Sequence, residues 1–241
     1  MSDRSLPPLA LPALFLALGI AAAGYFVSRT HYNARVALNT AQAKGLAERR
    51  VTANRANWTV SHMTTGTDRS EVTALYRRAE EDQKAIIDVL LEGGLQEGEI
   101  DTDVISYSMR EYRDENQILV DEKHTLSGYV HVETDNVTLI RKLRSDVNRL
   151  LARGINLSNH TPSYHFTKIN EVKPEMLKEA ARNAKIAARE FAENAGVKVG
   201  RIRSARQGVF EVRDAGSTSG DTRKLEKDVR VVITVDFYLT D

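Results

Sequence analysis

The feature that most constrains this chain is a run of uncharged, mostly apolar residues at its start, from Leu9 to Val27. No later stretch approaches it in length. A helix rises about 1.5 Å per residue, so this run would form a helix roughly 28 Å long, close to the hydrocarbon thickness of a bilayer, about 30 Å. The run therefore predicts that the protein is inserted in a membrane or exported across one.

Two interpretations of this segment compete. A cleavable signal peptide needs a basic start, a short apolar core and a small-residue cleavage site, and Ala21–Ala23 before Gly24 would serve as that site. Against cleavage, the start is barely basic, with Asp3 facing Arg4, and Tyr25–Val27 carries the apolar run past the site. These observations favour an uncleaved transmembrane anchor.

The basic residues near the segment do not settle its orientation. Arg4 stands alone on the N-terminal side, whereas Arg29, Arg35 and Lys44 follow the segment. Taken literally, the positive-inside rule would keep the large domain in the cytoplasm, but long domains translocate largely regardless of charge. The chain has no cysteine, which removes disulfides and thiolate metal sites and fits either compartment.

The composition indicates three parts: an anchor or signal segment over residues 1–27, a polar spacer over 28–43, and a domain over 44–241. Charged residues at 28% and hydrophobic residues at 41% are ordinary for a soluble globular domain. The net charge of +1 gives no global field that points to nucleic acid, so we expect no nucleic-acid partner.

Beyond the spacer, strand and helix patterns mix. Alternation predicts a strand over Val51–Met63. A helix follows, started by Asp68 and Glu71 at capping-box spacing and ended by Gly93-Gly94. Strands around residues 105–109 and 126–132, joined by a polar turn over residues 113–117, predict an antiparallel hairpin.

The second half repeats this mixture. Asp135 or Asn136 starts a helix that Gly154 ends, and a strand follows around residues 163–169. Pro174 is expected to open an alanine-rich helix that Gly196 closes. Two last strands, about 201–212 and 228–239, flank a Gly/Ser/Asp loop. Hairpins mixed with helices predict an α+β fold with a largely antiparallel sheet and three helices packed on it, after the N-terminal helix.

Several of these stretches resemble one family. Residues 44–51, Lys-Gly-Leu-Ala-Glu-Arg-Arg-Val, are similar to the G-x-A-E-x-x-V opening strand of the SIMPL domain, a bacterial envelope domain of unknown function. Residues 130–155 resemble that family's strand, Asp-started helix and Gly-Ile exit. The alanine helix ending at Gly196 and the strand over 229–239 also match. The resemblance covers about residues 40–241, although Asn54 stands where many members carry an acidic residue.

The resemblance implies a periplasmic domain, exported by a signal peptide and sometimes anchored. It outweighs the charge bias, so we expect a single-pass inner-membrane protein whose C-terminal domain lies in the periplasm. The family has no established catalytic residues that could be transferred. Members are associated with envelope and oxidative-stress phenotypes, so a stress-related role is a hypothesis for this chain. A deletion strain with unchanged sensitivity to peroxide would contradict it.

The sequence contains no recognised catalytic or metal-binding pattern. The histidines are scattered: His124 and His131 belong to opposite faces of one predicted strand, and His160 and His165 are five residues apart. No His-x-x-x-His spacing, Gly-x-Ser-x-Gly elbow, phosphate loop or dinucleotide fingerprint occurs. We therefore expect no enzyme activity, no catalytic, cofactor-binding or metal-binding residues and no cofactor, and interpret the histidines as structural.

Two weaker features remain. The segment Gly216–Gly220 could cradle an anion, but its place between two strands is more typical of a hairpin tip. The C-terminal half is locally basic, with Arg201, Arg203, Arg206, Arg213 and Arg223. These residues could bind anionic lipid or an acidic protein. Alternatively, their charges could protect a strand edge from aggregation. The acidic residues Glu80, Glu81 and Asp82 fit the polar face of a helix.

Three functions from different classes follow from these patterns. The favoured one is a membrane-anchored, non-enzymatic envelope protein that acts by self-association, as a homo-oligomer, or by partner binding. The alternative is a module that binds an anion or a lipid headgroup through the basic C-terminal strands. An unrecognised hydrolase is the least favoured, because it requires a serine or an aspartate close to one of the histidines inside a pocket.

Overall fold

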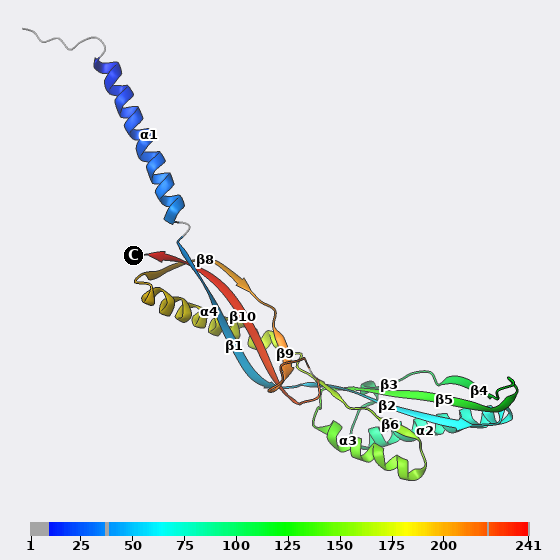
Figure 1. The fold of residues 1–241 in the computed structure, drawn as a ribbon. Coiled ribbons are helices and arrows are strands. Elements are labelled where there is room, and N and C mark those ends of the chain that lie inside the picture. Colours follow the sequence, from blue (N-terminus) through cyan, green and yellow to red (C-terminus); the bar gives the residue numbers. More distant parts are fainter. Residues whose placement is uncertain (1–9, 37–38, 221, 241) are drawn as a thin grey trace, which may run out of the picture. The chain divides into compact units, whose positions relative to one another are not determined.

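The computed structural model describes residues 10–36, 39–220 and 222–240 (Figure 1). The fold is α+β, with antiparallel sheets and four helices. The chain forms two compact units. Unit 1 comprises Met1–Ala47, Leu177–Val209 and Val231–Asp241; unit 2 comprises Glu48–Met176 and Phe210–Arg230. The prediction of an α+β fold with antiparallel pairing is confirmed.

The N-terminal apolar run forms helix α1 (Ala10–Val36), as its pattern predicts, and the helix continues into the segment expected to be a spacer. We searched the described part of the chain for a helix both long and apolar enough to span a bilayer and found none.

Unit 1 contains strands that pair in the order β1 (Thr40–Thr52), β10 (Glu226–Thr240), β8 (Lys198–Gln207), and helix α4 (Ile169–Asn194). The last residues of β1 and the first residues of β10 and α4 belong to unit 2. β10 alternates as predicted, with Val231, Ile233, Val235 and Phe237 buried. Every fourth residue of α4 is a buried alanine, which allows the close approach expected of an alanine-rich helix: Ala180, Ala184, Ala188 and Ala192.

Unit 2 is centred on an antiparallel sheet in which β5 (Leu119–Thr134) and β2 (Arg55–Gly66) are the long central strands. Three short strands flank them: β3 (Ile100–Thr102) pairs with β5, and β6 (Leu157–Asn159) and β7 (Ser163–His165) pair with β2. Strand β9 (Glu211–Asp214) pairs with the start of β10.

Helices α2 (Val72–Glu92) and α3 (Leu139–Asn148) lie along one side of this sheet (Figure 1). The core of unit 2 forms between them and the sheet, where Trp58, Val60, Val130 and Val132 meet Ile86, Leu90, Ile140 and Leu143. Three short 3-10 helices complete the unit: η1 (Arg69–Glu71) before α2, η2 (Glu97–Glu99) before β3 and η3 (Arg149–Arg153) after α3.

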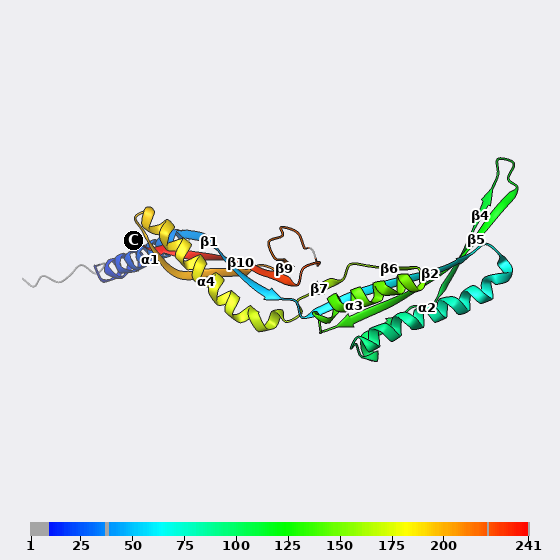
Figure 2. The ribbon, with the colours of Figure 1, turned by 90° about the horizontal axis from the view of Figure 1, so that it is seen from below.

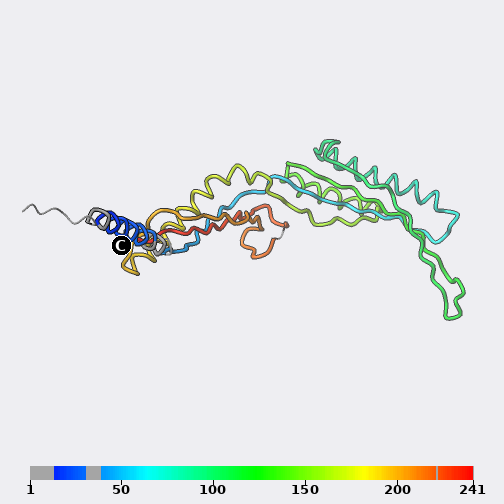
Figure 3. The backbone as a smooth tube through the Cα atoms, turned by 90° about the horizontal axis from the view of Figure 1, so that it is seen from above, coloured from blue at the N-terminus to red at the C-terminus, as the bar shows by residue number. Residues whose placement is uncertain are grey.

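Strand β4 (Ser106–Arg113) pairs with the first half of β5 in the predicted antiparallel hairpin. In Figures 2 and 3 the end of this hairpin bends away from the helices of unit 2. Every residue of β4 is exposed, and the turn has Gln117 at a positive φ of 63°. The hairpin is therefore held by its ladder of hydrogen bonds, with little packing of its own.

Four elements differ from the predictions in their bounds. The strand expected over Val51–Met63 is two strands, because β1 ends at Thr52 and β2 begins at Arg55. At the corner between them the Ala53 amide donates to the carbonyl of Leu225, and Asn54 bonds Thr167. The turn is therefore fixed by contacts with residues distant in the sequence. The local sequence contains no glycine or proline that would have predicted it.

Pro174 does not open the third predicted helix but lies inside α4, which begins at Ile169. The buried side of this helix starts earlier, since Ile169, Val172 and Met176 already follow helical spacing. The strand expected over 163–169 is only the three-residue β7, and the one expected over 201–212 divides into β8 and β9.

Candidate functional site

The two faces of the unit 2 sheet carry different side chains. In the antiparallel register of β2 and β5, Trp58 pairs with Val132 and Val60 with Val130 on the core face. Residues between them point the other way, where Thr59 pairs with His131 and Ser61 with Tyr129. These side chains are exposed or half-buried. We call this polar surface the open face: Asn57, Thr59, Ser61, Tyr129, His131, Glu133, His160 and Ser163.

A carboxylate, an imidazole and a hydroxyl form a hydrogen-bonded chain on the open face. The His131 ring joins Asp103 Oδ2 through Nε2 at 3.2 Å and Thr59 Oγ1 through Nδ1 at 3.1 Å. The ring of Tyr129 stacks against that of His131, with centroids 6.3 Å apart. Hydrolases with a hydroxyl nucleophile use this order of groups, in which an acid orients the imidazole and the imidazole activates the hydroxyl.

The residues of this hydrogen-bonded chain are accessible to solvent. The side chains of His131 and Asp103 are 42% and 60% exposed. A water-excluding pocket strengthens the electrostatic interactions on which acid–base and nucleophilic catalysis depend. The depression over these residues has a volume of about 490 Å³ and is also lined by His160, whose Nε2 lies 3.1 Å from Ser61 Oγ in a second imidazole–hydroxyl pair.

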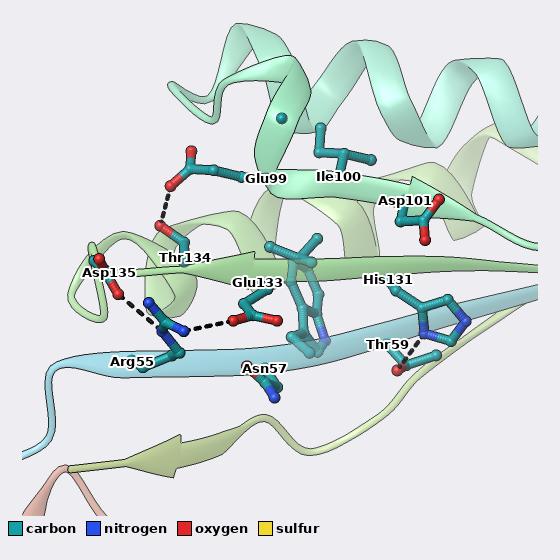
Figure 4. A pocket seen from close by; sticks show the side chains of 13 residues that line it. Arg55, Asn57, Thr59, Glu99, Ile100, Asp101, His131, Glu133, Thr134 and Asp135 are labelled. Carbon is teal, nitrogen blue, oxygen red and sulfur yellow. Dashed lines mark hydrogen bonds and ion pairs between the residues drawn. The ribbon is translucent and has the colours of Figure 1, made fainter. Parts of the chain in front are cut away.

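An ionic cluster adjoins the histidines at the other end of the open face (Figure 4). Arg55 bonds Glu133 at 2.9 Å and Asp135 at 3.0 Å. The hydrogen bond to Asp135 and the charges of both carboxylates raise the pKa of Arg55 above its ordinary value. A depression of about 600 Å³ runs from this cluster to Thr59 and His131. The open face is thus a polar surface with two shallow hollows, in which the charged groups already have partners.

The histidines of unit 2 occupy different environments. His124 is fully buried on the core face, between Tyr107 Oη at 2.8 Å and Glu122 Oε1 at 3.1 Å, whereas His131 lies on the opposite face, as predicted. His165 bonds the Ser163 hydroxyl at 3.2 Å. Among the described residues, no three His, Cys, Asp or Glu side chains are placed to hold a metal ion.

The pairing of Thr59 with His131 could not be found from sequence. Alternation placed each residue on a strand face, but their contact depends on the register of two strands about seventy residues apart. The contribution of Asp103 depends on the chain between β3 and β4, which carries no periodic pattern. The sequence analysis therefore missed the chain of Asp103, His131 and Thr59.

The loop between β9 and β10 is closed by its own carboxylates. The amide of Gly216 donates to Asp228 Oδ2 at 2.9 Å, and Ser217 N donates to the Asp214 carbonyl. This matches the interpretation of Gly216–Gly220 as a hairpin tip, since its first amides are used internally.

The C-terminal arginines do not form one patch within a unit. Arg201, Arg203 and Arg206 belong to β8 in unit 1, whereas Arg213 and Arg223 belong to unit 2. Arg213 is paired with Glu48 at 2.6 Å. The acidic residues Glu80, Glu81 and Asp82 lie on α2, where Asp82 accepts a hydrogen bond from the Thr64 hydroxyl at 3.3 Å.

A family model described as SIMPL, a protein of unknown function (DUF541), matches residues 42–237. The chain belongs to the SIMPL family. The resemblance drawn from residues 44–51, 130–155, the alanine helix and the last strand is therefore confirmed over almost the whole chain after α1. A search of curated proteins gave no match.

Some solved structures share partial similarity with this SIMPL protein. They include amidases of the hydantoinase/carbamoylase family from Burkholderia vietnamiensis (11% identity, 56% of this chain, 33% of that chain, TM-score 0.25) and Burkholderia ambifaria (12%, 54%, 34%, 0.26). A putative aminohydrolase from methicillin-resistant Staphylococcus aureus is similar at 12% identity over 54% of this chain and 36% of that chain, with a TM-score of 0.26. The SIMPL chain covers about a third of these proteins, and at such scores the likeness carries no argument.

Proposed function

We propose that this SIMPL protein is a non-enzymatic envelope protein that acts by self-association or by binding a partner protein through the open face of unit 2. The observation that carries the proposal is the pairing of Thr59 with His131 and of Ser61 with His160 on a sheet face whose other side is packed against helices. These groups are ordered by hydrogen bonds yet remain accessible. Accessible, preorganised polar groups favour association, because little conformational entropy is lost on contact.

The test combines the native mass of the full chain in mild detergent with a change on the open face. We expect Tyr129→Arg to reduce the mass of the assembly or to abolish capture of a partner, since it places a bulky charge beside His131. The control is Arg78→Ala, an exposed change on α2. A monomer that captures no partner would contradict the proposal, as would a Tyr129→Arg protein that behaves like the parent.

We further propose that the protein is exported and that its SIMPL domain functions in the periplasm, with the N-terminal segment as a single-pass inner-membrane anchor. The apolar run from Leu9 to Val27 and the envelope setting implied by the family support this location. A fusion of alkaline phosphatase after Thr240 would be active only outside the cytoplasm. The N-terminal sequence of the mature protein then distinguishes an intact anchor from cleavage after Ala23.

A hydrolase is the second candidate, because one specific observation favours it: Asp103, His131 and Thr59 form a carboxylate–imidazole–hydroxyl chain. In this mechanism His131 would take the proton from Thr59 Oγ1 as that oxygen attacks an ester or amide carbonyl, while Asp103 stabilises the imidazolium. Purified protein would be assayed with a chromogenic acetyl ester. Activity lost equally in Thr59→Val and His131→Asn would support a hydrolase, and activity retained in both would exclude this site.

A further inference from the structure

A third hollow in unit 2, which adjoins the one over His131 and His160, is bounded by four cationic side chains. Two come from helix α3, Arg141 and Arg144, and two from the segment before β10, Arg223 and Lys224. Its volume is about 560 Å³, within the range of small-molecule sites. The remaining lining residues are mainly uncharged, with one acid: Thr161, Pro162, Tyr164, Leu225 and Glu226.

Hydrogen bonds to Asn159 hold Arg144 of α3 in position at the cavity. Arg141 and Arg144 are three residues apart, so they lie on the same side of the helix. Asn159 accepts from Arg144 Nε at 3.4 Å and donates to the Arg144 carbonyl at 3.0 Å. The same Asn159 oxygen accepts from Trp58 Nε1 at 2.9 Å, which connects this side of the cavity to the core.

The other pair of cations is positioned by a buried carboxylate. Asp214 Oδ2 accepts from the backbone amides of Arg223 at 2.9 Å and Lys224 at 3.1 Å. Its second oxygen forms a buried ion pair with Lys227. The segment that carries Arg223 and Lys224 is therefore ordered from beneath, while their side chains remain exposed at the cavity.

The four cations at the cavity outnumber the one acid among its lining residues, Glu226, whose carboxylate accepts a hydrogen bond from the Thr52 hydroxyl. Within residues 39–220 and 222–240, none of the four cations forms an ion pair, in contrast to Arg50, Arg55 and Arg213 of the same unit. Lys224 Nζ donates only to the carbonyl of Ala215, at 2.9 Å. A group of like charges around a partly apolar hollow raises the local concentration of anions.

We propose that this cavity binds a small ligand that carries a phosphate group. Guanidinium groups match the geometry of phosphate oxygens and bond them bidentately, and two arginines from α3 with one from the opposite segment could hold one phosphate from two sides. Pro162, Tyr164 and Leu225 offer an apolar wall for the rest of the ligand. The site shares no residue with the open face, although Thr161 lines both this cavity and the adjoining hollow. The proposal does not depend on the proposed function.

The phosphate could belong to a soluble phosphate ester or to a phospholipid headgroup, and the two sources need separate probes. Inorganic pyrophosphate, titrated into the full-length protein by calorimetry at constant ionic strength, represents the soluble source. Vesicles of phosphatidylglycerol, compared with vesicles of phosphatidylcholine, represent the headgroup.

We expect saturable binding of at least one probe, weakened about tenfold or more by Arg141→Ala and by Arg223→Ala, as expected for losing a charged hydrogen bond. Lys142→Ala is the matched control, because Lys142 is an exposed cation on α3 next to Arg141 but does not line the cavity. This control should change the affinity less than twofold. Arg141→Lys, which keeps the charge and loses the bidentate geometry, should give an intermediate loss.

Binding of pyrophosphate that depends on Arg141 and Arg223 would identify a soluble ligand, and dependence seen only with phosphatidylglycerol vesicles would identify a headgroup. The proposal is overturned if neither probe binds saturably, or if Lys142→Ala weakens binding as much as Arg141→Ala, which would indicate a diffuse surface charge. The emission of Trp58, the single tryptophan and a buried one, verifies that each variant is folded.

Discussion

Gly45 on β1 lies directly against Ala180 on α4. A Cβ placed on Gly45 would be 1.9 Å from the carbonyl oxygen of Ala180 and 2.5 Å from the amide nitrogen of Ala184. Both alanines are fully buried. In unit 1 a strand backbone and a helix backbone therefore touch without intervening side chains, which explains why this part of the helix consists of alanines at every fourth position.

Gly45→Ala should destabilise unit 1, because the new methyl group would meet backbone atoms that cannot move aside alone. Overpacking of this kind costs typically about 1–3 kcal/mol. Urea unfolding of the full chain measures the change. Gly98→Ala is the control, since a Cβ at Gly98 has no neighbour within 4 Å. Equal effects of the two substitutions would show that the contact with Ala180 is unimportant.

Breaking the buried ion pair of Asp214 and Lys227 should be strongly destabilising. Each side chain is about 2% exposed, and removing one partner leaves an uncompensated buried charge, which costs about 3–5 kcal/mol. We expect Lys227→Met to lower the free energy of unfolding in this range. The double variant Asp214→Asn with Lys227→Met should recover part of the loss, and a double variant no more stable than Lys227→Met would argue against the pair.

The same carboxylate makes stability depend on acid. Burial would raise the pKa of Asp214, but hydrogen bonds from Lys227 and from the amides of Lys224 and Arg223 outweigh it and lower this pKa. The stabilisation is thus fully present above the ordinary pKa of an aspartate and is lost as the pH falls below it. The contribution of Asp214 to this acid dependence should disappear in the double variant, whereas carboxylates such as Asp228 and Asp236, whose pKa values are also lowered, keep theirs.

His62 should make the fold less stable under mildly acidic conditions. Burial lowers the pKa of His62 below its ordinary value of 6.5, against weaker opposing effects of the Gln83 hydrogen bond and the Asp82 charge. The unfolded chain therefore binds more protons, and stability falls as the pH drops through about 6.5. His62→Leu should flatten this dependence in unfolding measured between pH 7.5 and 5, whereas His160→Leu, at an exposed position, should not. An unchanged slope in His62→Leu would contradict this assignment.

Asn54 holds the corner between β1 and β2. Its Nδ2 donates to the Thr167 hydroxyl at 2.9 Å, and its Oδ1 accepts from the Thr167 amide at 2.8 Å. An aspartate could accept both bonds once the hydroxyl turned to donate. Asn54→Asp should therefore change the melting temperature little, and Asn54→Ala should cost about 1–3 kcal/mol. A larger loss in Asn54→Asp would indicate that the donated bond is essential.

Local patterns in the sequence predicted most of the fold. The apolar stripe of α2 ends at Gly93-Gly94, α3 runs through η3 to Gly154, and β10 alternates over its buried residues, as expected. These features depend on spacing and on glycine conformation, with Gly94 and Gly154 at positive φ. The division into β1 and β2 was missed because contacts with Leu225 and Thr167 create it.

The candidate sites could not be predicted from the sequence, because they too depend on contacts between residues distant in the chain. The bond between Thr59 and His131 depends on strand register, and the basic cavity joins α3 with a segment about eighty residues later. Arg223 was singled out from sequence as part of a basic C-terminal stretch. It lines the cavity together with Arg141 and Arg144, for which the sequence pattern indicated no role.

The loop between β9 and β10 is closed at its base by two carboxylates, one from each strand: Asp214 binds the amides of Arg223 and Lys224, and Asp228 binds Gly216. The tip from Ser217 to Gly220 takes no part in that closure beyond the amide of Ser217. This makes the tip a natural point of insertion. An epitope or a small fluorescent reporter placed between Thr218 and Ser219 should leave both strands paired, so that the protein can be followed in living cells without altering either terminus.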